Sequence, residues 1–218
     1  MSYLRYFFLF ALFVIGFSSC RKFEQEKVVA RADPFVPTNL YPIERLPSYF
    51  NRVVVLPCYY PDEDSHLLTY IDDIFQQELA QERIFETIRI ETKQMKRVFG
   101  VERVSSAGEL PENFLRKLED MTNANGVLFA DLNSYRPYRP MSIGVRAKLV
   151  DIKTGEFMWA IDETFDAGHA SIIVGSSQFQ EKAQVRALSA KTSGSVLHSP
   201  RIFAKYVAST TFSTLPLR

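Results

Sequence analysis

The sequence predicts a single α/β domain, in which a mixed sheet of about five strands packs against helices in the order β-α-β-α-β-β-β-α. Apolar runs without a polar face alternate with helical repeats in the first half of the chain. Two strands that each have one polar face follow around a tight turn. A hydrophobic content of 46% in 218 residues is enough for one buried core. Residues 51–218 are therefore assigned to one domain.

The first half of this domain reads as alternating strands and helices. Residues 52–57 (RVVVLP) form a β-branched run typical of a central strand that is covered on both sides. Residues 67–79 repeat apolar side chains at helical spacing, with Asp72, Asp73 and Gln76 on the opposite, polar face. The next predicted elements are a strand at 84–90, a helix at 114–121 that ends at 123–126, and an apolar strand at 127–132.

The second half is predicted as an antiparallel hairpin followed by helices. Residues 142–151 and 156–165 alternate apolar and polar side chains around the turn Lys153-Thr154-Gly155, and Trp159 belongs to the apolar row. We expect Trp159 to fill the core, with an interface role as the alternative. A short helix is expected near 178–187, and Ser199-Pro200 has the pattern of an N-cap and first residue of a closing helix.

The N-terminus has the pattern of a secretory signal peptide. Arg5 precedes an apolar stretch at residues 6–17 (YFFLFALFVIGF), and Ser18-Ser19-Cys20 follows. As a helix this stretch would cover about 18 Å, which is less than the roughly 30 Å of a bilayer core. We therefore expect residues 1–19 to be a signal peptide. The ending resembles the lipobox of bacterial lipoproteins, which implies that Cys20 receives a diacylglyceryl group. The alternative is an ordinary signal peptide in which Cys20 is incidental.

A lipid on Cys20 would decide where the protein lies. Two or three acyl chains such as palmitate, at roughly 0.8 kcal/mol per buried CH₂, hold a soluble domain on a bilayer. In the lipoproteins resembled here, a residue other than Asp after the cysteine leaves the protein free for sorting to the outer membrane, and this chain has Arg21. The expected location is the periplasmic face of the outer membrane. The covalent lipid is the one non-protein group predicted, and no other cofactor is expected.

Cys58 has no intrachain partner if Cys20 carries a lipid, so no disulfide is expected. It ends an apolar run, which predicts a small buried side chain, with a reactive thiol as the alternative. Residues 20–50 are predicted as a tether, because a charged stretch is followed by four prolines that favour extended backbone. Fully extended, this tether could reach on the order of 100 Å, although Pro-rich segments also pack along a domain.

Several segments of the chain resemble one family. RVVVLP at the first strand, GVLFADLNSYRPYRP, and SIGVRAKLVDIKTGEFMWA, together with the lipobox, are similar to periplasmic lipoproteins of the CsgG/PelC/TolB N-terminal type. The resemblance covers roughly residues 52–165. It implies an envelope component that forms a ring or assists export of a polymer or protein. Residues 132–161 leave room only for short connections, so the pore-forming hairpins of CsgG itself are not expected.

Common catalytic and metal-binding motifs do not occur in the sequence. There is no nucleophile elbow, P-loop, GxGxxG, HExxH or paired CxxC. His66, His169 and His198 are widely separated, and the acidic residues 62–64 precede a helix, where they are expected to act as caps. Asp162 and Glu163 are adjacent on a strand and face opposite sides. We expect no catalytic residues, no metal site and no enzymatic activity.

The most suggestive cluster is a doublet of Tyr-Arg-Pro at residues 135–140. Tyr135, Arg136, Tyr138 and Arg139 supply planar surfaces that can stack on sugars or meet a protein, and the prolines stiffen the backbone. This predicts an interaction loop. The alternative is that the prolines block edge pairing and the side chains cover the core.

The function predicted from these observations is that of a non-catalytic outer-membrane lipoprotein in envelope assembly or in polymer or protein export. The alternative is a tethered regulatory module that binds a peptidoglycan synthase or another envelope enzyme. Expected partners are the membrane through the anchor, envelope proteins, polysaccharide or peptidoglycan, and further copies of the chain. Nucleic acid is not expected, because 26 Lys and Arg balance 25 Asp and Glu.

Overall fold

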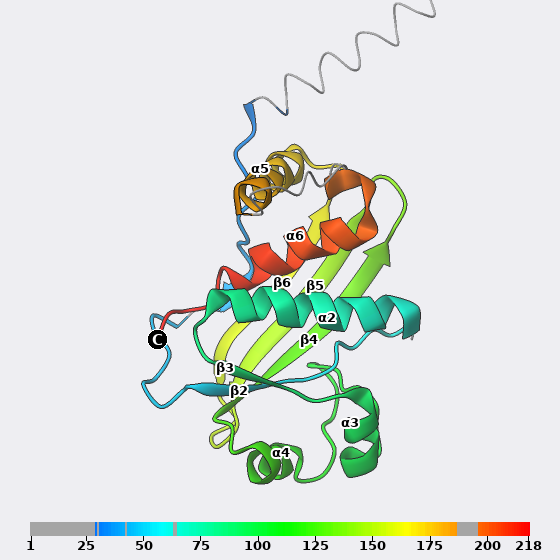
Figure 1. Ribbon diagram of the computed structural model, residues 1–218. Helices are drawn as coiled ribbons and strands as arrows, with labels where there is room; N and C mark the ends of the chain where they lie inside the picture. Colours follow the sequence, from blue (N-terminus) through cyan, green and yellow to red (C-terminus); the bar gives the residue numbers. More distant parts are fainter. Residues whose placement is uncertain (1–28, 30, 42, 63–64, 187–195) are drawn as a thin grey trace, which may run out of the picture.

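The computed structural model describes residues 29, 31–41, 43–62, 65–186 and 196–218. The predicted signal peptide and Cys20 lie outside these ranges. A six-stranded mixed sheet forms the centre of the described part, in the order β1-β6-β5-β4-β2-β3 (Figure 1). The α/β fold predicted from the sequence is confirmed.

Parallel and antiparallel pairing divide the sheet into two halves. β2 lies between β3 and β4 and is parallel to both, whereas the pairs β4–β5, β5–β6 and β6–β1 are antiparallel. Parallel neighbours need a crossover, and helices supply it here; antiparallel neighbours need only a turn. The strands are β1 (Leu40–Tyr41), β2 (Arg52–Val55), β3 (Glu86–Arg89), β4 (Gly126–Arg136), β5 (Ser142–Asp151) and β6 (Phe157–Asp166).

Helices cover the two faces of the sheet unequally. The helices are α2 (Ser65–Glu82), α3 (Thr92–Phe99), α4 (Phe114–Thr122), α5 (Ala170–Arg186) and α6 (Pro200–Phe212), with a short 3₁₀ helix η1 at Val196–His198. Buried side chains of α2, α5 and α6 share the larger core with one face, and α3 and α4 share a smaller core with the other. None of the helices in the described ranges combines the length and apolar composition needed to cross a membrane.

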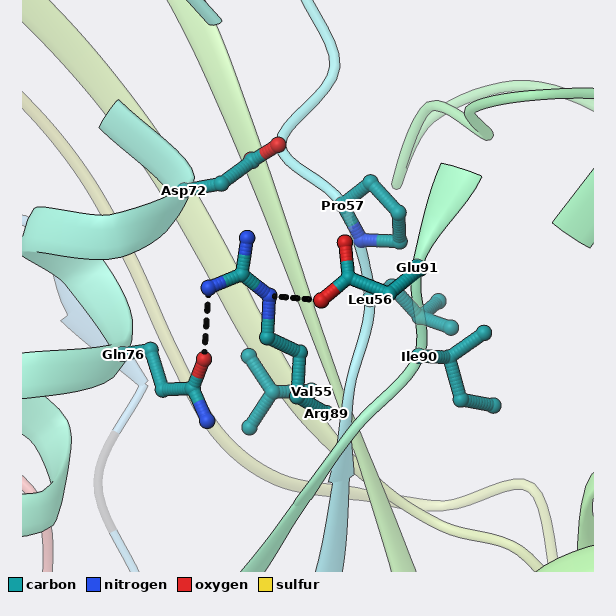
Figure 2. A pocket seen from close by; sticks show the side chains of 8 residues that line it. All are labelled: Val55, Leu56, Pro57, Asp72, Gln76, Arg89, Ile90 and Glu91. Carbon is teal, nitrogen blue, oxygen red and sulfur yellow. Dashed lines mark hydrogen bonds and ion pairs between the residues drawn. The ribbon is translucent and has the colours of Figure 1, made fainter. Parts of the chain in front are cut away.

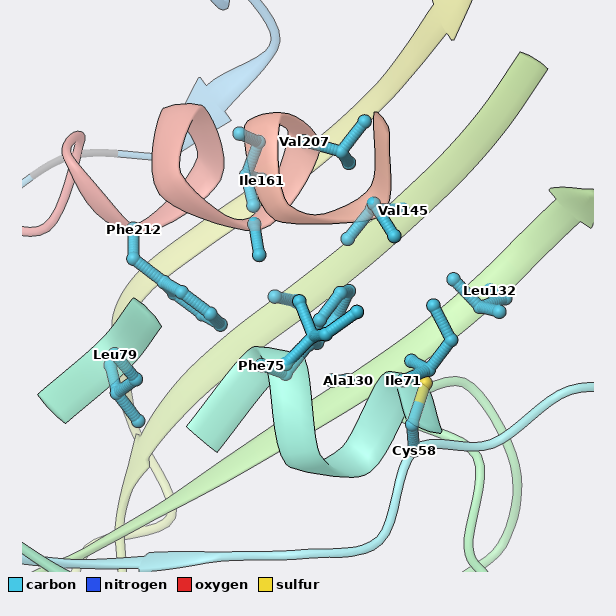
Figure 3. Packing of buried hydrophobic residues seen from close by; sticks show 14 of the residues in the cluster. Cys58, Ile71, Phe75, Leu79, Ala130, Leu132, Val145, Ile161, Val207 and Phe212 are labelled. Carbon is cyan, nitrogen blue, oxygen red and sulfur yellow. The ribbon is translucent and has the colours of Figure 1, made fainter. Parts of the chain in front are cut away.

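The larger core is built from the residues that the apolar repeats identify. Phe75 of α2 and Phe212 of α6 meet edge to face, with ring centroids 5.7 Å apart, above β4, β5 and β6 (Figure 3). Trp159 is fully buried, and its indole N–H donates to Thr214 Oγ1 at 3.1 Å. The expectation that Trp159 fills the core is confirmed. Cys58 is also buried, with 1% of its surface exposed.

β1, α3 and the short η1 were not predicted, and α5 begins earlier than expected. β1 has only two residues and exists because it pairs with Ile161 and Ala160 of β6. α3 lies in a mostly polar stretch, and two buried side chains four residues apart, Met95 and Phe99, attach it to the smaller core. Short elements of this kind depend on tertiary contacts rather than on a long repeat.

The described part of the predicted tether packs against the domain from residue 35 onward. The Phe35 amide donates to the carbonyl of Ser171, and the Phe35 ring lies 5.0 Å from that of Phe165. Farther along, Leu46 N–H donates to the carbonyl of Leu217 near the C-terminus. Fifteen residue steps separate Cys20 from Phe35, so this part of the chain can span at most about 50 Å.

Candidate functional site

The carboxyl ends of the parallel strands are the place where open α/β sheets usually bind ligands. Here the ends of β2 and β3 are occupied by ion pairs (Figure 2). Arg89 is the last residue of β3, and its guanidinium donates to Asp73 at 2.7 Å and to Gln76 at 3.0 Å, both on α2. Arg89 Nε also lies 2.8 Å from a Glu91 oxygen. Four side chains therefore satisfy one another at this edge.

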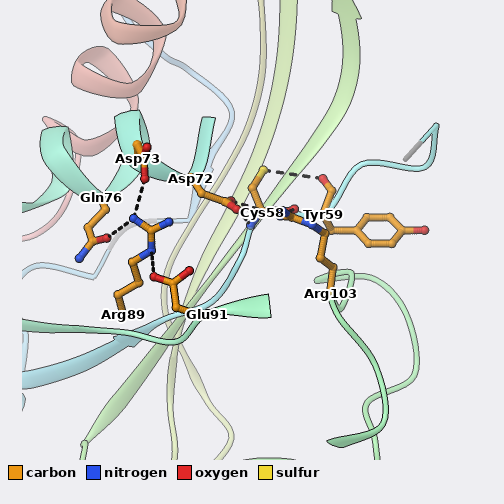
Figure 4. Close-up of polar contacts among 8 residues, drawn as sticks. All are labelled: Cys58, Tyr59, Asp72, Asp73, Gln76, Arg89, Glu91 and Arg103. Atoms are coloured by element: carbon orange, nitrogen blue, oxygen red, sulfur yellow. Dashed lines mark hydrogen bonds and ion pairs between the residues drawn. The ribbon is translucent and has the colours of Figure 1, made fainter. Parts of the chain in front are cut away.

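A second ion pair closes the neighbouring end of β2 (Figure 4). Arg103 donates to both oxygens of Asp72, at 2.9 and 3.2 Å, and to the carbonyl of Cys58. The Cys58 amide donates to Asp72 at 2.7 Å. Burial raises the pKa of the Asp72 carboxyl, and the hydrogen bonds and charge of Arg103 oppose this shift. Asp72 thus connects α2 to β2 and to the segment after α3.

The cavity between these ion pairs is too small for a substrate. The cavity between Pro57, Asp72, Arg89 and Glu91 measures about 10 Å³, which is close to the space for a single water. The Cys58 thiol points into the core (Figure 3), and burial raises its pKa well above the ordinary value. A buried, protonated thiol is a poor nucleophile. The expected buried Cys58 is confirmed, and this edge has a structural role.

Asp72, Asp73 and Gln76, which were predicted on the polar face of α2, are half-buried. All three side chains are engaged at the sheet edge, because Arg89 and Arg103 lie there. The pairing could not be read from the sequence, since Arg103 is 31 residues from Asp72 and lies in a segment without regular structure.

Asp131 anchors the same segment on the other face of the sheet. Only 3% of Asp131 is exposed, and its carboxylate accepts hydrogen bonds from the Ser105 hydroxyl and from the amide and hydroxyl of Ser106, each at 2.9 Å. Lys148 on β5 donates to the Ser106 carbonyl at 2.7 Å. No sequence pattern identified Asp131, which lies within a run of apolar residues.

The predicted interaction loop is the far end of the β4–β5 hairpin, and its four side chains divide into two pairs. Tyr135 and Arg136 support the hairpin. The Tyr135 hydroxyl lies 2.6 Å from that of Tyr70 on α2. Arg136 donates to the Pro140 carbonyl at 2.7 Å and to Asp166 at the end of β6 at 3.0 Å.

Tyr138 and Arg139 form the outer pair of the hairpin. Tyr138 is 80% exposed, and Arg139 is exposed as well. Neither side chain takes part in a hydrogen bond or ion pair within the described ranges. A supported loop that presents an aromatic ring beside a guanidinium can contact a partner without first being ordered.

The histidines and acidic residues considered above do not form a site in the described part of the chain. His169 precedes α5, and His198 ends η1; both are exposed. Asp162 binds Arg146 at 2.7 Å, whereas Glu163 accepts hydrogen bonds from the amides of residues 38 and 39. Across the described ranges, no three His, Cys, Asp or Glu side chains are placed to hold a metal ion.

Comparison with known proteins gives structural similarities at low sequence identity. No protein-family model matches the chain, and no curated protein matches its sequence. The PelC dodecamer from Paraburkholderia phytofirmans is similar at 15% identity and a TM-score of 0.49, over 82% of this chain and 96% of that one. Lipoprotein GNA1162 from Neisseria meningitidis is similar at 14% identity and a TM-score of 0.40, over 64% and 99% of the two chains. The LpoB C-terminal domain from Salmonella enterica is similar at 13% identity and a TM-score of 0.34, over 65% and 95%. These three TM-scores are below 0.5, so the family named above remains a prediction.

Proposed function

We propose that this protein is a non-catalytic lipoprotein of the cell envelope. Acyl chains on Cys20 would hold it on the periplasmic face of the outer membrane, where it would act in envelope assembly or in export of a polymer or protein. The observation that carries this proposal is the apolar stretch at residues 6–17 followed by Ser18-Ser19-Cys20. A lipid anchor of this kind holds a soluble domain on a bilayer without a membrane-spanning segment.

The β4–β5 hairpin supports an interaction role for the anchored domain. Arg136 and Tyr135 fix the hairpin to β6 and α2, and this leaves Tyr138 and Arg139 exposed at its end. The carboxyl ends of the parallel strands, where an enzyme of this architecture would bind substrate, are closed by Asp72 and the two arginines. Both features favour contact with a macromolecule over chemistry on a small molecule.

Metabolic labelling tests the anchor. Cells that express the full chain are labelled with an alkyne analogue of palmitate, and the wild type is compared with Cys20→Ala. We expect a labelled wild-type protein in the membrane fraction and an unlabelled, soluble variant. Cys58 is buried and remains in both proteins, so it does not supply the label. Equal labelling or equal fractionation of the two would contradict the proposal.

Partners are identified by cross-linking from the hairpin. A photoreactive amino acid at position 138 in the anchored protein should capture neighbours in cells. Self-cross-links, with a defined oligomer in native mass spectrometry, would support the ring that the family resemblance implies. Capture of a peptidoglycan synthase would support the regulatory alternative instead. The span of at most about 50 Å before residue 35 restricts such a partner to the vicinity of the membrane.

A further inference from the structure

The amino ends of the parallel strands form an open cleft, in contrast to the closed carboxyl ends. Arg52 and Glu86 begin β2 and β3, and Asn125 immediately precedes β4. In Figure 1 this edge lies where the cyan β2 begins. The cleft has a volume of about 580 Å³, within the range of small-ligand sites. Its lining residues are Tyr49, Asn51, Arg52, Glu86, Asn123 and Asn125.

Backbone hydrogen bonds fix the floor of the cleft. The Asn125 amide donates to the Arg52 carbonyl at 2.9 Å, and the Glu86 amide donates to the Asn51 carbonyl at 2.8 Å. The Asn51 amide donates to the side-chain oxygen of Asn125 at 3.3 Å. The three strand ends are therefore held together before any ligand arrives, which lowers the entropic cost of binding.

Tyr49 forms one wall of the cleft, and its ring is held in place. Half of Tyr49 is exposed, and its hydroxyl donates to Asp151 at 2.8 Å. Asp151 is itself buried and accepts two backbone amides of the β5–β6 turn. The hydrogen bond to Asp151 raises the pKa of Tyr49, so the phenol stays neutral. The ring thus offers an uncharged planar surface at a fixed angle.

The asparagine side chains are available to a ligand. Within the described ranges, the side-chain amides of Asn51 and Asn123 make no hydrogen bond, and both residues are exposed. An amide both donates and accepts, which matches groups such as hydroxyls that also do both. Asn123 has a left-handed backbone, with φ of 50°, that sets the direction of its side chain.

The charges of the lining side chains cancel, while the nearby carboxylates of Asp151 and Glu156 raise the pKa of Tyr49 and disfavour an anionic ligand. Arg52 Nε lies 3.4 Å from Glu86, and these are the two ionic side chains among the lining residues. Arg52 Nε is buried and makes no hydrogen bond in the described part of the chain, so its contact with Glu86 is an ion pair without a hydrogen bond. A lining with one positive and one negative group has no net attraction for an anion or a cation. The ligand that fits is neutral and rich in hydroxyl groups.

We propose that this cleft binds a neutral saccharide, with Tyr49 against a sugar ring and with Asn51 and Asn123 hydrogen-bonded to its hydroxyls. The proposal deepens the proposed function and rests on it for the presence of glycans near the protein. It concerns a surface that is separate from the β4–β5 hairpin, so the two can be tested independently.

The test is calorimetric titration of the full acylated chain, in a detergent that carries no sugar, with defined oligosaccharides. The neutral probes are cellotetraose and tetra-N-acetylchitotetraose, and the charged comparison is tetragalacturonate. We expect at least one neutral probe to bind and the charged one to bind more weakly. The double variant Asn51→Ala/Asn123→Gly should weaken binding at least about tenfold, because two hydrogen bonds are lost.

Asn113→Gly is the matched control. Asn113 also has a left-handed backbone, with φ of 56°, but lies at the start of α4 and not in the cleft. This variant should bind as the wild type does. The saccharide proposal is overturned if neither neutral probe binds, if tetragalacturonate binds best, or if the double variant binds as tightly as Asn113→Gly. Membrane fractionation of the double variant in cells should be unchanged, so failure here is distinct from failure of the lipid anchor.

Discussion

Asp72 and Arg103 form a two-pronged ion pair in which each carboxylate oxygen accepts one guanidinium N–H. The pair links α2 to the segment after α3, and the Cys58 amide and carbonyl join it from the end of β2. Both side chains are largely buried, so each charge depends on the other for compensation. The closed edge of the sheet therefore depends on this pair.

Arg103→Ala should destabilise the fold by about 2–3 kcal/mol in urea unfolding, because it leaves the buried Asp72 carboxylate without its partner. The matched control is Lys96→Ala, which removes an exposed ion pair with Glu102. This variant should change the urea concentration at the midpoint of unfolding little. Equal effects of the two variants would contradict a structural role for Arg103.

The effect of Arg103→Ala should also depend on pH. The pKa of Asp72 is raised from 3.8 in the folded protein, and loss of Arg103 removes the group that opposes this shift. An acid with a raised folded pKa favours the folded state when it is protonated, and this contribution is lost as pH rises through the folded pKa. The difference in unfolding free energy between Arg103→Ala and the wild type should therefore be smaller at pH 4 than at pH 7.

Tyr206 predicts a loss of stability at alkaline pH. It lies among the rings of Phe165, Phe179 and Phe203, and burial raises its pKa from 10.0 to about 12. The unfolded chain releases this proton first, so the folded state loses stability as pH rises from 10 to 12, by about 2 kcal/mol. Tyr206→Phe should unfold at a higher urea concentration than the wild type at pH 12, with a smaller difference at pH 8.

The hairpin predicts separate effects on stability and on partner binding. Arg136→Ala should lower the unfolding free energy by about 0.5 kcal/mol, since its ion pair with Asp166 is partly exposed. Tyr138→Ala should leave stability unchanged but remove cross-links formed from neighbouring position 139. A Tyr138→Ala protein that keeps those cross-links would argue against the hairpin as the contact surface.

A substitution of Gly126, at the start of β4, tests how closely this strand packs against Phe50. A Cβ at this position would overlap the ring of Phe50, which is fully buried. Gly126→Ala should therefore destabilise the protein by about 1–3 kcal/mol in thermal or urea unfolding. At Gly108 a Cβ would lie 3.6 Å from its nearest neighbour, Ser105 Cβ, so Gly108→Ala should have little effect.

Elements with a long repeat or a strong terminal signal were predictable. Three such patterns predicted elements that the structure contains. They are the apolar run before Pro57, the helical spacing around Phe75 and the alternation around Trp159, and all three contribute buried side chains to the larger core. Ser199 accepts a hydrogen bond from the Ile202 amide, as its N-cap pattern predicted. Local signals of this kind depend on neighbours within a few residues, so a single sequence contains them.

The candidate sites were less predictable, because they join residues that are distant in the chain. The sequence identified Tyr135, Arg136, Tyr138 and Arg139 as a cluster. Only the contacts of Tyr135 with Tyr70 and of Arg136 with Asp166 show which of the four support the loop. No pattern in the sequence predicted the cleft at the amino ends of the parallel strands. Its residues come from three separate segments, and each is an ordinary polar or aromatic residue of a loop or strand end when read alone.

The sequence alone determined the α/β class, the order of the main elements and the expectation of a lipid on Cys20. Periodicity, capping and the lipobox pattern involve residues close together in the chain, so a single sequence contains them. Tertiary structure decided that the carboxyl ends of the parallel strands are closed and the amino ends open. The reason is that a buried charge needs a partner, and Arg89 and Arg103 reach α2 only once β2, β3 and α2 have packed together.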